Sequence, residues 1–152
     1  MLEVETPQDM ERYVGQSLGC SDWILIDQDR INAFAQITGD DNWIHVNVER
    51  AKRELPEGKT IAHGLLTLSM VPFLGGQICK IVRRSRGINY GANKVRFTTP
   101  VKSGDEIRLH RKLEKYEPIE GGARLTFGNV MEIKGVERPA LIAETISVMY
   151  GL

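Results

Sequence analysis

The 152-residue sequence predicts an α+β fold in which an antiparallel sheet wraps around one central, apolar helix. First, residues 64–74 are apolar on every face, which is typical of a helix enclosed by other elements. Second, the apolar period changes to two from Gly87 onward, as expected for strands. Third, the segments between these strands are short and rich in turn residues, whereas parallel strands need roughly a dozen residues to cross over.

A helix is predicted near the N-terminus, where Thr6 can cap it and Pro7 suits its first position. Its apolar stripe consists of Met10, Tyr13, Val14 and Leu18. Gly19 follows this stripe and is the expected stop, so we expect a short cover helix over residues 7–18.

A strand and a second helix are predicted next. The run Trp23–Ile26 is short, apolar and partly β-branched, so it predicts the first strand, with Trp23 in the core. A helix is predicted from Asp27 to Ile37, because Asp27 can cap it and its apolar residues share one face. Gly39 comes just after the last periodic residue and is the expected stop.

The segment after Gly39 is predicted to be a loop that carries Asp40, Asn42 and His45. Side chains on a loop that is held between rigid elements can converge on a small target. A second short helix, capped by Asn47, is expected to close this loop.

The central helix is predicted from Gly64 to Leu74, after a loop at residues 54–59 that contains Pro and Gly. Its apolar residues are Leu65, Leu66, Leu68, Met70, Val71, Phe73 and Leu74. Pro72 leaves the backbone carbonyl of Leu68 without a partner, so the helix should bend or end early near residues 75–76.

Four runs of strand length follow the helix, and the short links between them imply an antiparallel meander. The runs are Ile88–Thr98, Glu106–Tyr116, Ala123–Ile133 and Ala140–Met149. Turn residues separate them at positions 102–105, 118–122 and 134–139.

Composition predicts a single globular domain over residues 1–152, large enough to bury a core without disulfide or metal staples. Lys plus Arg and Asp plus Glu number 20 each, and this zero net charge argues against a nucleic-acid binder. The two cysteines, Cys20 and Cys79, stand in no metal-ligand spacing, which favours a reduced, cytoplasmic protein. No apolar run approaches the ~20 residues that a membrane span needs, so no membrane association is expected.

Asp40 and His45 are candidates for acid–base chemistry on a water molecule. They stand five residues apart, and near neutral pH a charged carboxylate and a largely neutral imidazole can both accept a proton from one water. The same residue types also occur together in ordinary turns, because Asn and Asp bond to their own backbone. The spacing alone therefore leaves a catalytic loop and a plain turn both open.

The run from Phe34 to His45 resembles the hydratase motif of the MaoC-like dehydratases, the family of the (R)-specific enoyl-CoA hydratases. That motif reads approximately as an aromatic, a small residue, Gly, Asp, any residue, Asn, Pro, an aliphatic and His; Trp43 stands here at the Pro position. Residues 61–69 and 89–104 resemble the family's central helix and the following strand in its nodulation-protein-N-like branch. The matches lie within residues 23–104, just over half of the chain, and imply a hot-dog fold.

The resemblance implies hydration of a trans-2-enoyl thioester of coenzyme A to (R)-3-hydroxyacyl-CoA, or the reverse, with no cofactor beyond the substrate's coenzyme A. Asp40 and His45 would bind the water, one as base and one as acid, in an order that the sequence leaves open. Asn42 would fix the loop or bind substrate. The backbone N–H of Gly64, at the helix start, would meet the thioester oxygen, although close helix packing also explains a glycine there. Members of the family are typically dimers that pair their sheets edge to edge, so a homodimer is expected.

Three other features of the sequence bear on the site. His63 is expected to be structural or capping rather than catalytic. A metal site is not expected, because the three histidines include no i, i+4 pair. Arg96 is a candidate for binding the phosphates of coenzyme A, and a solvated surface is the alternative. Other basic residues near it in sequence are Arg83, Arg84, Arg86 and Lys94.

Two alternatives to a hydratase stay open at this point. A thioesterase on the same fold would release free coenzyme A thiol, and a non-catalytic acyl-CoA-binding protein would do neither reaction. The sequence favours hydration because Asp40 and His45 stand at the motif's spacing, whereas only Trp43 favours a binding protein. Acyl chain length and physiological direction are not predicted.

Overall fold

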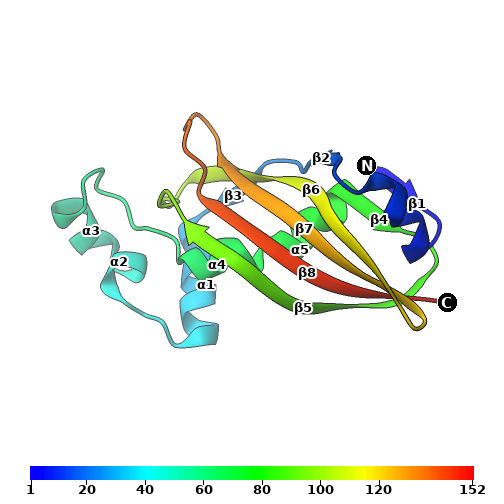
Figure 1. Ribbon diagram of the computed structural model, residues 1–152. Helices are drawn as coiled ribbons and strands as arrows, with labels where there is room; N and C mark the ends of the chain where they lie inside the picture. Colours follow the sequence, from blue (N-terminus) through cyan, green and yellow to red (C-terminus); the bar gives the residue numbers. More distant parts are fainter.

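The computed structural model describes residues 1–152. The helices are η1 (Pro7–Tyr13, a 3-10 helix), α1 (Gln28–Thr38), α2 (Trp43–Val46), α3 (Val48–Glu54), α4 (Gly64–Ser69) and α5 (Val71–Ile78). The strands are β1 (Leu2–Val4), β2 (Ser17–Cys20), β3 (Ile24–Ile26), β4 (Cys79–Ile81), β5 (Arg84–Phe97), β6 (Asp105–Ile119), β7 (Gly122–Ile133) and β8 (Leu141–Gly151). Helices α4 and α5 lie against one face of the long strands, and α1, α2 and α3 gather beyond one end of the sheet (Figure 1). This arrangement confirms the predicted α+β class.

The main sheet has the strand order β2-β6-β7-β8-β5, and β3 also pairs with β6. Strands β6, β7 and β8 form the predicted meander, but β5 pairs with β8 rather than with β6. The predicted order is therefore wrong at its first link, because residues 98–104 cross the end of the sheet instead of forming a hairpin. The segment before α4 holds this crossing in place, since Ala62 N donates to Val101 O at 2.7 Å and Ser103 N donates to Thr60 O at 3.0 Å.

The N-terminal region differs from the prediction in two ways. η1 ends at Tyr13, because Gly15 N donates to Leu113 O at 2.7 Å and draws the chain into the sheet, where residues 17–20 form β2. Residues 2–4 form β1, which pairs in parallel with β4, so the run at Trp23 is not the first strand. Thr6 takes the predicted N-cap position, and its N–H and hydroxyl both donate to the Asp9 carboxylate.

The central apolar helix is confirmed, but it breaks at Met70 into α4 and α5 and then continues through residues 75–76. Pro72 falls in the first turn of α5, where a missing backbone N–H removes no helical hydrogen bond. The prediction that the helix is enclosed on all faces is wrong for the single chain. Leu65 is 59% exposed and Phe73 is 56% exposed, because the sheet covers only the opposite side of the helix.

A row of polar side chains interrupts the apolar inner face of the sheet beneath α5. Arg111 Nε donates to Asn129 Oδ1 at 3.1 Å, and Asn129 Nδ2 donates to Thr145 Oγ1 at 2.9 Å. The Arg111 guanidinium lies 4.5 Å from the centre of the Phe127 ring and against Gly75, where an added Cβ would come within 2.1 Å of it. Burial lowers the pKa of Arg111 to about 10, because the charged form loses hydration.

Trp23 is half-buried, with the Arg108 guanidinium 4.4 Å from the centre of its indole ring. The prediction that this side chain lies in the core is therefore wrong. Cys20 and Cys79 are not joined in a disulfide. None of the helices is both long and apolar enough to span a membrane.

Candidate functional site

Helix α1 directly precedes the site and ends at Gly39, as predicted. Asp27 Oδ1 accepts a hydrogen bond from Arg30 N at 2.9 Å and caps the helix. Gly39 ends it with a φ of 79°, a left-handed conformation that glycine adopts without a steric penalty. Asp40 follows directly, with its side chain exposed.

His45 lies on the short helix α2 and not on an open loop, which corrects the prediction for this residue. Asn42 caps α2, because its Oδ1 accepts from Ile44 N at 3.3 Å. Trp43 then takes the first helical position, where proline is also favoured. The departure from the motif at this position therefore leaves a capped turn intact. The Arg50 guanidinium stacks 3.9 Å from the centre of the indole ring.

The ring of His45 is oriented by a backbone carbonyl. His45 Nδ1 lies 2.5 Å from Ile61 O, and Ile61 N donates in return to Ile44 O at 2.9 Å. A carbonyl oxygen only accepts hydrogen bonds, so Nδ1 carries the proton and Nε2 keeps a free lone pair in the neutral ring. Gln28 Nε2 donates to the His45 carbonyl at 2.7 Å and ties α2 to α1. The structure thus presents His45 Nε2 as a proton acceptor.

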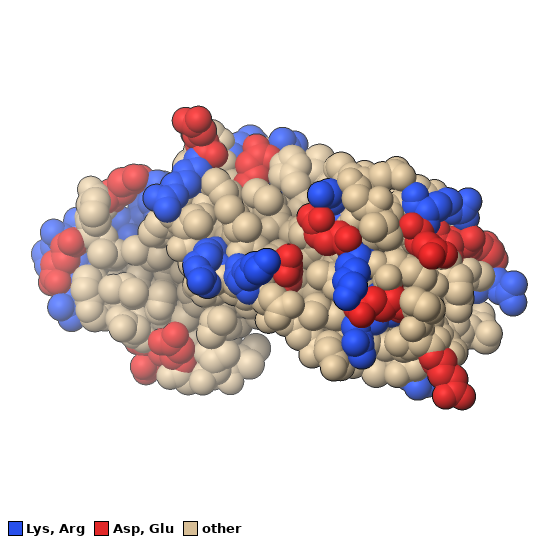
Figure 2. Space-filling view, viewed as in Figure 1, with Lys and Arg blue, Asp and Glu red and all other residues tan.

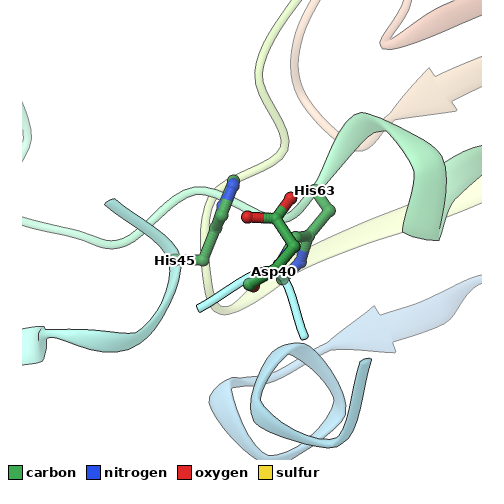
Figure 3. Close-up of side chains that lie close together, drawn as sticks. All are labelled: Asp40, His45 and His63. Carbon is green, nitrogen blue, oxygen red and sulfur yellow. The ribbon is translucent and has the colours of Figure 1, made fainter. Parts of the chain in front are cut away.

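Asp40, His45 and His63 come together at one point, although they lie on three different segments (Figure 3). One nitrogen or oxygen atom from each of the three side chains lies within 4.8 Å of the others. The two imidazole rings stack, with centroids 3.8 Å apart and planes inclined by 24°. The three side chains also have the donor atoms that could hold a metal ion. That no metal is bound here stays a prediction.

A pocket of about 240 Å³ opens beside His45. It is lined by His45, Ile61, Ala62, Gly64, Thr67, Phe97, Thr99, Pro100, Val101 and Ala140. The lining combines apolar side chains with a few polar groups, a combination typical of small-molecule sites. A larger hollow of about 470 Å³, on the face of the sheet away from the helix, contains none of the predicted site residues.

Gly64 is the first residue of α4 and lines the pocket, so its backbone N–H belongs to the set without a partner inside the helix. A Cβ at this position would come within 2.8 Å of the Phe97 ring. Gly64 therefore both packs closely against Phe97 and lines the pocket, so the two explanations that the sequence allowed for this glycine hold together.

Two predicted substrate-binding residues lie outside the pocket lining. Asn42 is exposed and occupied as the α2 cap, and Arg96 is exposed on β5 beside Phe97. Arg96 Nη1 donates to Val95 O at 2.8 Å. The basic residues 83–86 lie at the other end of β5. Figure 2 shows Lys and Arg interspersed with acidic groups rather than gathered in one basic patch on the face drawn.

Sequence reasoning missed two residues that shape the site. Gln28 bridges α2 and the segment before α4, because it also accepts from Thr60 Oγ1 at 2.5 Å. No local pattern marks a glutamine for such a long-range role. The sequence predicts Phe97 only as part of a strand, although its place at the strand end, three residues before Pro100, is a usable signal.

Comparison with known proteins agrees with this geometry. A family model described as a MaoC like domain matches residues 9–130. The 3-hydroxyacyl-thioester dehydratase Z of Mycobacterium tuberculosis is 40% identical over 147 residues, which cover 96% of this chain and 97% of the relative. Nodulation protein N of Rhizobium leguminosarum bv. viciae is 41% identical over 144 residues, which cover 93% and 89%.

A solved structure shows the same fold. The R-hydratase PhaJ1 of Pseudomonas aeruginosa, in its unliganded form, matches with a TM-score of 0.75 at 21% identity, over 91% of this chain and 83% of that one. The antiparallel sheet around a central helix is thus a hot-dog fold, as predicted. With the family match and the two relatives, it follows that the chain belongs to the MaoC-like dehydratases, a family of hydro-lyases.

Proposed function

We propose that the protein is an (R)-specific enoyl-CoA hydratase, which adds water to a trans-2-enoyl-CoA or catalyses the reverse dehydration. One observation carries the proposal: a carboxylate oxygen of Asp40 lies within 4.8 Å of a ring nitrogen of His45, whose Nε2 keeps a free lone pair, and His45 lines a pocket with apolar walls. The names of the relatives, a dehydratase and an R-hydratase among them, support the same reaction class.

In this proposal His45 is the base. Its Nε2 accepts one proton of the water while the oxygen attacks C3, because Ile61 O holds the other ring nitrogen as a donor. Asp40, as a carboxylate, accepts the second hydrogen of the same water and orients it. The proton gained by Nε2 is the one that C2 requires, so the addition balances without a further proton carrier.

Other groups would bind the thioester. Negative charge develops on its oxygen as C3 is attacked, and the N–H of Gly64 would donate to it. Asn42 acts mainly through the cap of α2, and Arg96 would meet a phosphate of coenzyme A from the pocket edge. Coenzyme A enters as part of the substrate, and no separate cofactor is needed.

We also propose a homodimer in which two β5 edges pair. β5 contacts β8 on one side only, and its 14 residues are almost all exposed. Edge strands of this length are prone to pair with another chain. Pairing would cover Ile88, Tyr90 and Phe97, which are 47%, 60% and 49% exposed. Because Phe97 also lines the pocket, the site would lie at the subunit interface. Each subunit would be a single hot-dog domain over residues 1–152, in the cytoplasm.

The first test compares Asp40→Asn with Asp41→Asn, its exposed neighbour on the same segment. Wild type should remove the conjugated ultraviolet absorbance of crotonyl-CoA or a longer enoyl-CoA. Asp40→Asn should lower this rate at least about 100-fold, since the water loses an acceptor, whereas Asp41→Asn should keep it. The product should be oxidised by an (R)-specific but not by an (S)-specific 3-hydroxyacyl-CoA dehydrogenase.

A thiol reagent in a parallel cuvette separates the alternatives. Release of free thiol by wild type would replace the proposal with a thioesterase. Tight binding of enoyl-CoA without either reaction would identify a binding protein, and equal rates for the two variants would remove Asp40 from the mechanism.

A further inference from the structure

We propose that His63 is a positioning residue that aligns Asp40 and His45 for reaction without carrying a proton itself. The inference rests on the function proposed above, but its geometric part can be tested without turnover.

The side chain of His63 does not serve the helix that it precedes. It stands at the N-cap position of α4 and makes no capping hydrogen bond. Instead, its Nε2 lies 2.8 Å from the backbone oxygen of Asp40, a residue 23 positions earlier in the chain. Because that oxygen only accepts, Nε2 carries the proton and donates it. This bond fixes the backbone from which the reactive carboxylate projects (Figure 3).

The same ring also limits the movement of His45. The two imidazoles stack at 3.8 Å, and the Phe34 ring of α1 lies 4.9 Å from His63 at an inclination of 54°. The bond from His45 Nδ1 to Ile61 O fixes one direction of the His45 ring, and the stack resists tilting about that bond. His63 thus contacts both groups that would hold the water.

His63 is itself poorly placed to take up a proton. It is 3% exposed, and its Nδ1 is buried without a hydrogen-bond partner. A proton added at Nδ1 would leave a buried N–H unsatisfied, which is unfavourable. It would also place a second positive charge against His45 whenever His45 is protonated in the reaction. A proton-carrying role at Nδ1 therefore lacks a hydrogen-bond partner, whereas the Nε2–H donor has one.

Three substitutions separate the hydrogen bond from the stack. His63→Gln places an amide N–H at the position of Nε2 but removes the ring, His63→Asn places its amide at the position of Nδ1, and His63→Phe keeps only a ring. We expect His63→Gln to keep kcat within about tenfold of wild type, since it loses only the stacking contact. His63→Asn and His63→Phe should lower kcat about 100-fold, with KM nearly unchanged, because a misplaced Asp40 affects the reacting geometry.

Imidazole nitrogen NMR on the unliganded protein tests the geometry directly. The spectra should show the Nδ1–H form for His45 and the Nε2–H form for His63, and the His45 tautomer should persist in His63→Gln. An Nδ1–H form for His63 would overturn the proposal. So would equal rates for all three variants, or a rise in KM that matches the fall in kcat, with folding checked by thermal melting. If wild type hydrates no enoyl-CoA, the proposed function fails while the NMR result still decides the geometry.

Discussion

Position 43 lies at the start of α2, between the residue that caps the helix and the histidine of the site. The preceding residue, Asn42, has a ψ of 135°, which is the range that a following proline requires. Trp43 is helical and needs no intrahelical partner for its N–H. The side chain is thus not required for the turn, and its visible contact is with Arg50.

Trp43→Pro should therefore preserve activity. Restricting the unfolded chain should stabilise the protein by ~0.4–1 kcal/mol, and loss of the contact with Arg50 should offset about as much. Trp43→Ala, which loses the contact without gaining rigidity, should be the less stable variant. Hydration rates and urea denaturation of both variants provide the check. A fall in kcat for Trp43→Pro as large as that for Asp40→Asn would mean that the indole ring itself shapes the site.

The outer face of the sheet carries a charged cluster that spans β6 and β7. Arg108 pairs directly with Glu132 across the two strands, with Nε 2.6 Å from Oε2, and His110 Nε2 lies 2.5 Å from the same oxygen. Hydrogen bonds from Arg108 and then His110 lower the pKa of the Glu132 carboxyl. The cluster also holds Trp23 on the surface, since the indole ring lies under Arg108.

Glu132→Gln should weaken the fold in a pH-dependent way. A carboxyl whose pKa is lowered on folding stabilises the protein above its unfolded pKa, and this stabilisation is lost as pH falls through the lower folded pKa. Unfolding free energies from urea denaturation of wild type and variant should differ near neutral pH, by less than about 1 kcal/mol because these groups are partly exposed, and should converge in acid. Glu106→Gln is the matched control on the same sheet, where the carboxylate pairs with Lys134. If the difference in unfolding free energy between wild type and Glu132→Gln grew in acid, the stabilising role of the ionised Glu132 carboxylate would be contradicted.

At the scale of elements, the sequence predicted which segments form strands but not how all of them pair. The period of two marks β5 to β8 whatever their order, and the turn residues at 102–105 are equally compatible with a hairpin and with a crossing. What decides between them is the pair of bonds from residues 60–62 to residues 101–103, and these join distant parts of the chain. The role of His63 was hidden for the same reason, because its partner Asp40 lies 23 positions away.

The part of the site that depends on neighbouring residues could be predicted from the sequence. The end of α1 at Gly39 and the spacing of Asp40 and His45 depend only on residues that are close in sequence. In the structure, Gly39 ends α1, and Asp40 and His45 lie close together. The pocket, by contrast, combines the start of α4 with the segment after β5. No periodicity within either segment could have indicated that the two face each other.

For the whole molecule, the exposed apolar side chains of β5 and of the central helix lead us to expect a dimer. Ile88→Asp should break the proposed dimer, because it places a charge in an edge that pairs with its copy. Light scattering should give about twice 17.1 kDa for wild type and a smaller mass for the variant. Ile142→Asp, on β8 away from the edge and 45% exposed, is the matched control and should leave the mass unchanged. A monomeric wild type would contradict the proposed assembly.

The contact between Gly75 and Arg111 links two positions that are 36 residues apart in the chain. Any side chain at 75 would occupy the space that the guanidinium now fills, and a shorter residue at 111 would leave that space empty and Asn129 without its donor. A change at either position alone is therefore unfavourable, whereas a larger residue at 75 together with a smaller one at 111 conserves volume. In natural or engineered relatives, a larger residue at position 75 should therefore occur together with a smaller residue at position 111.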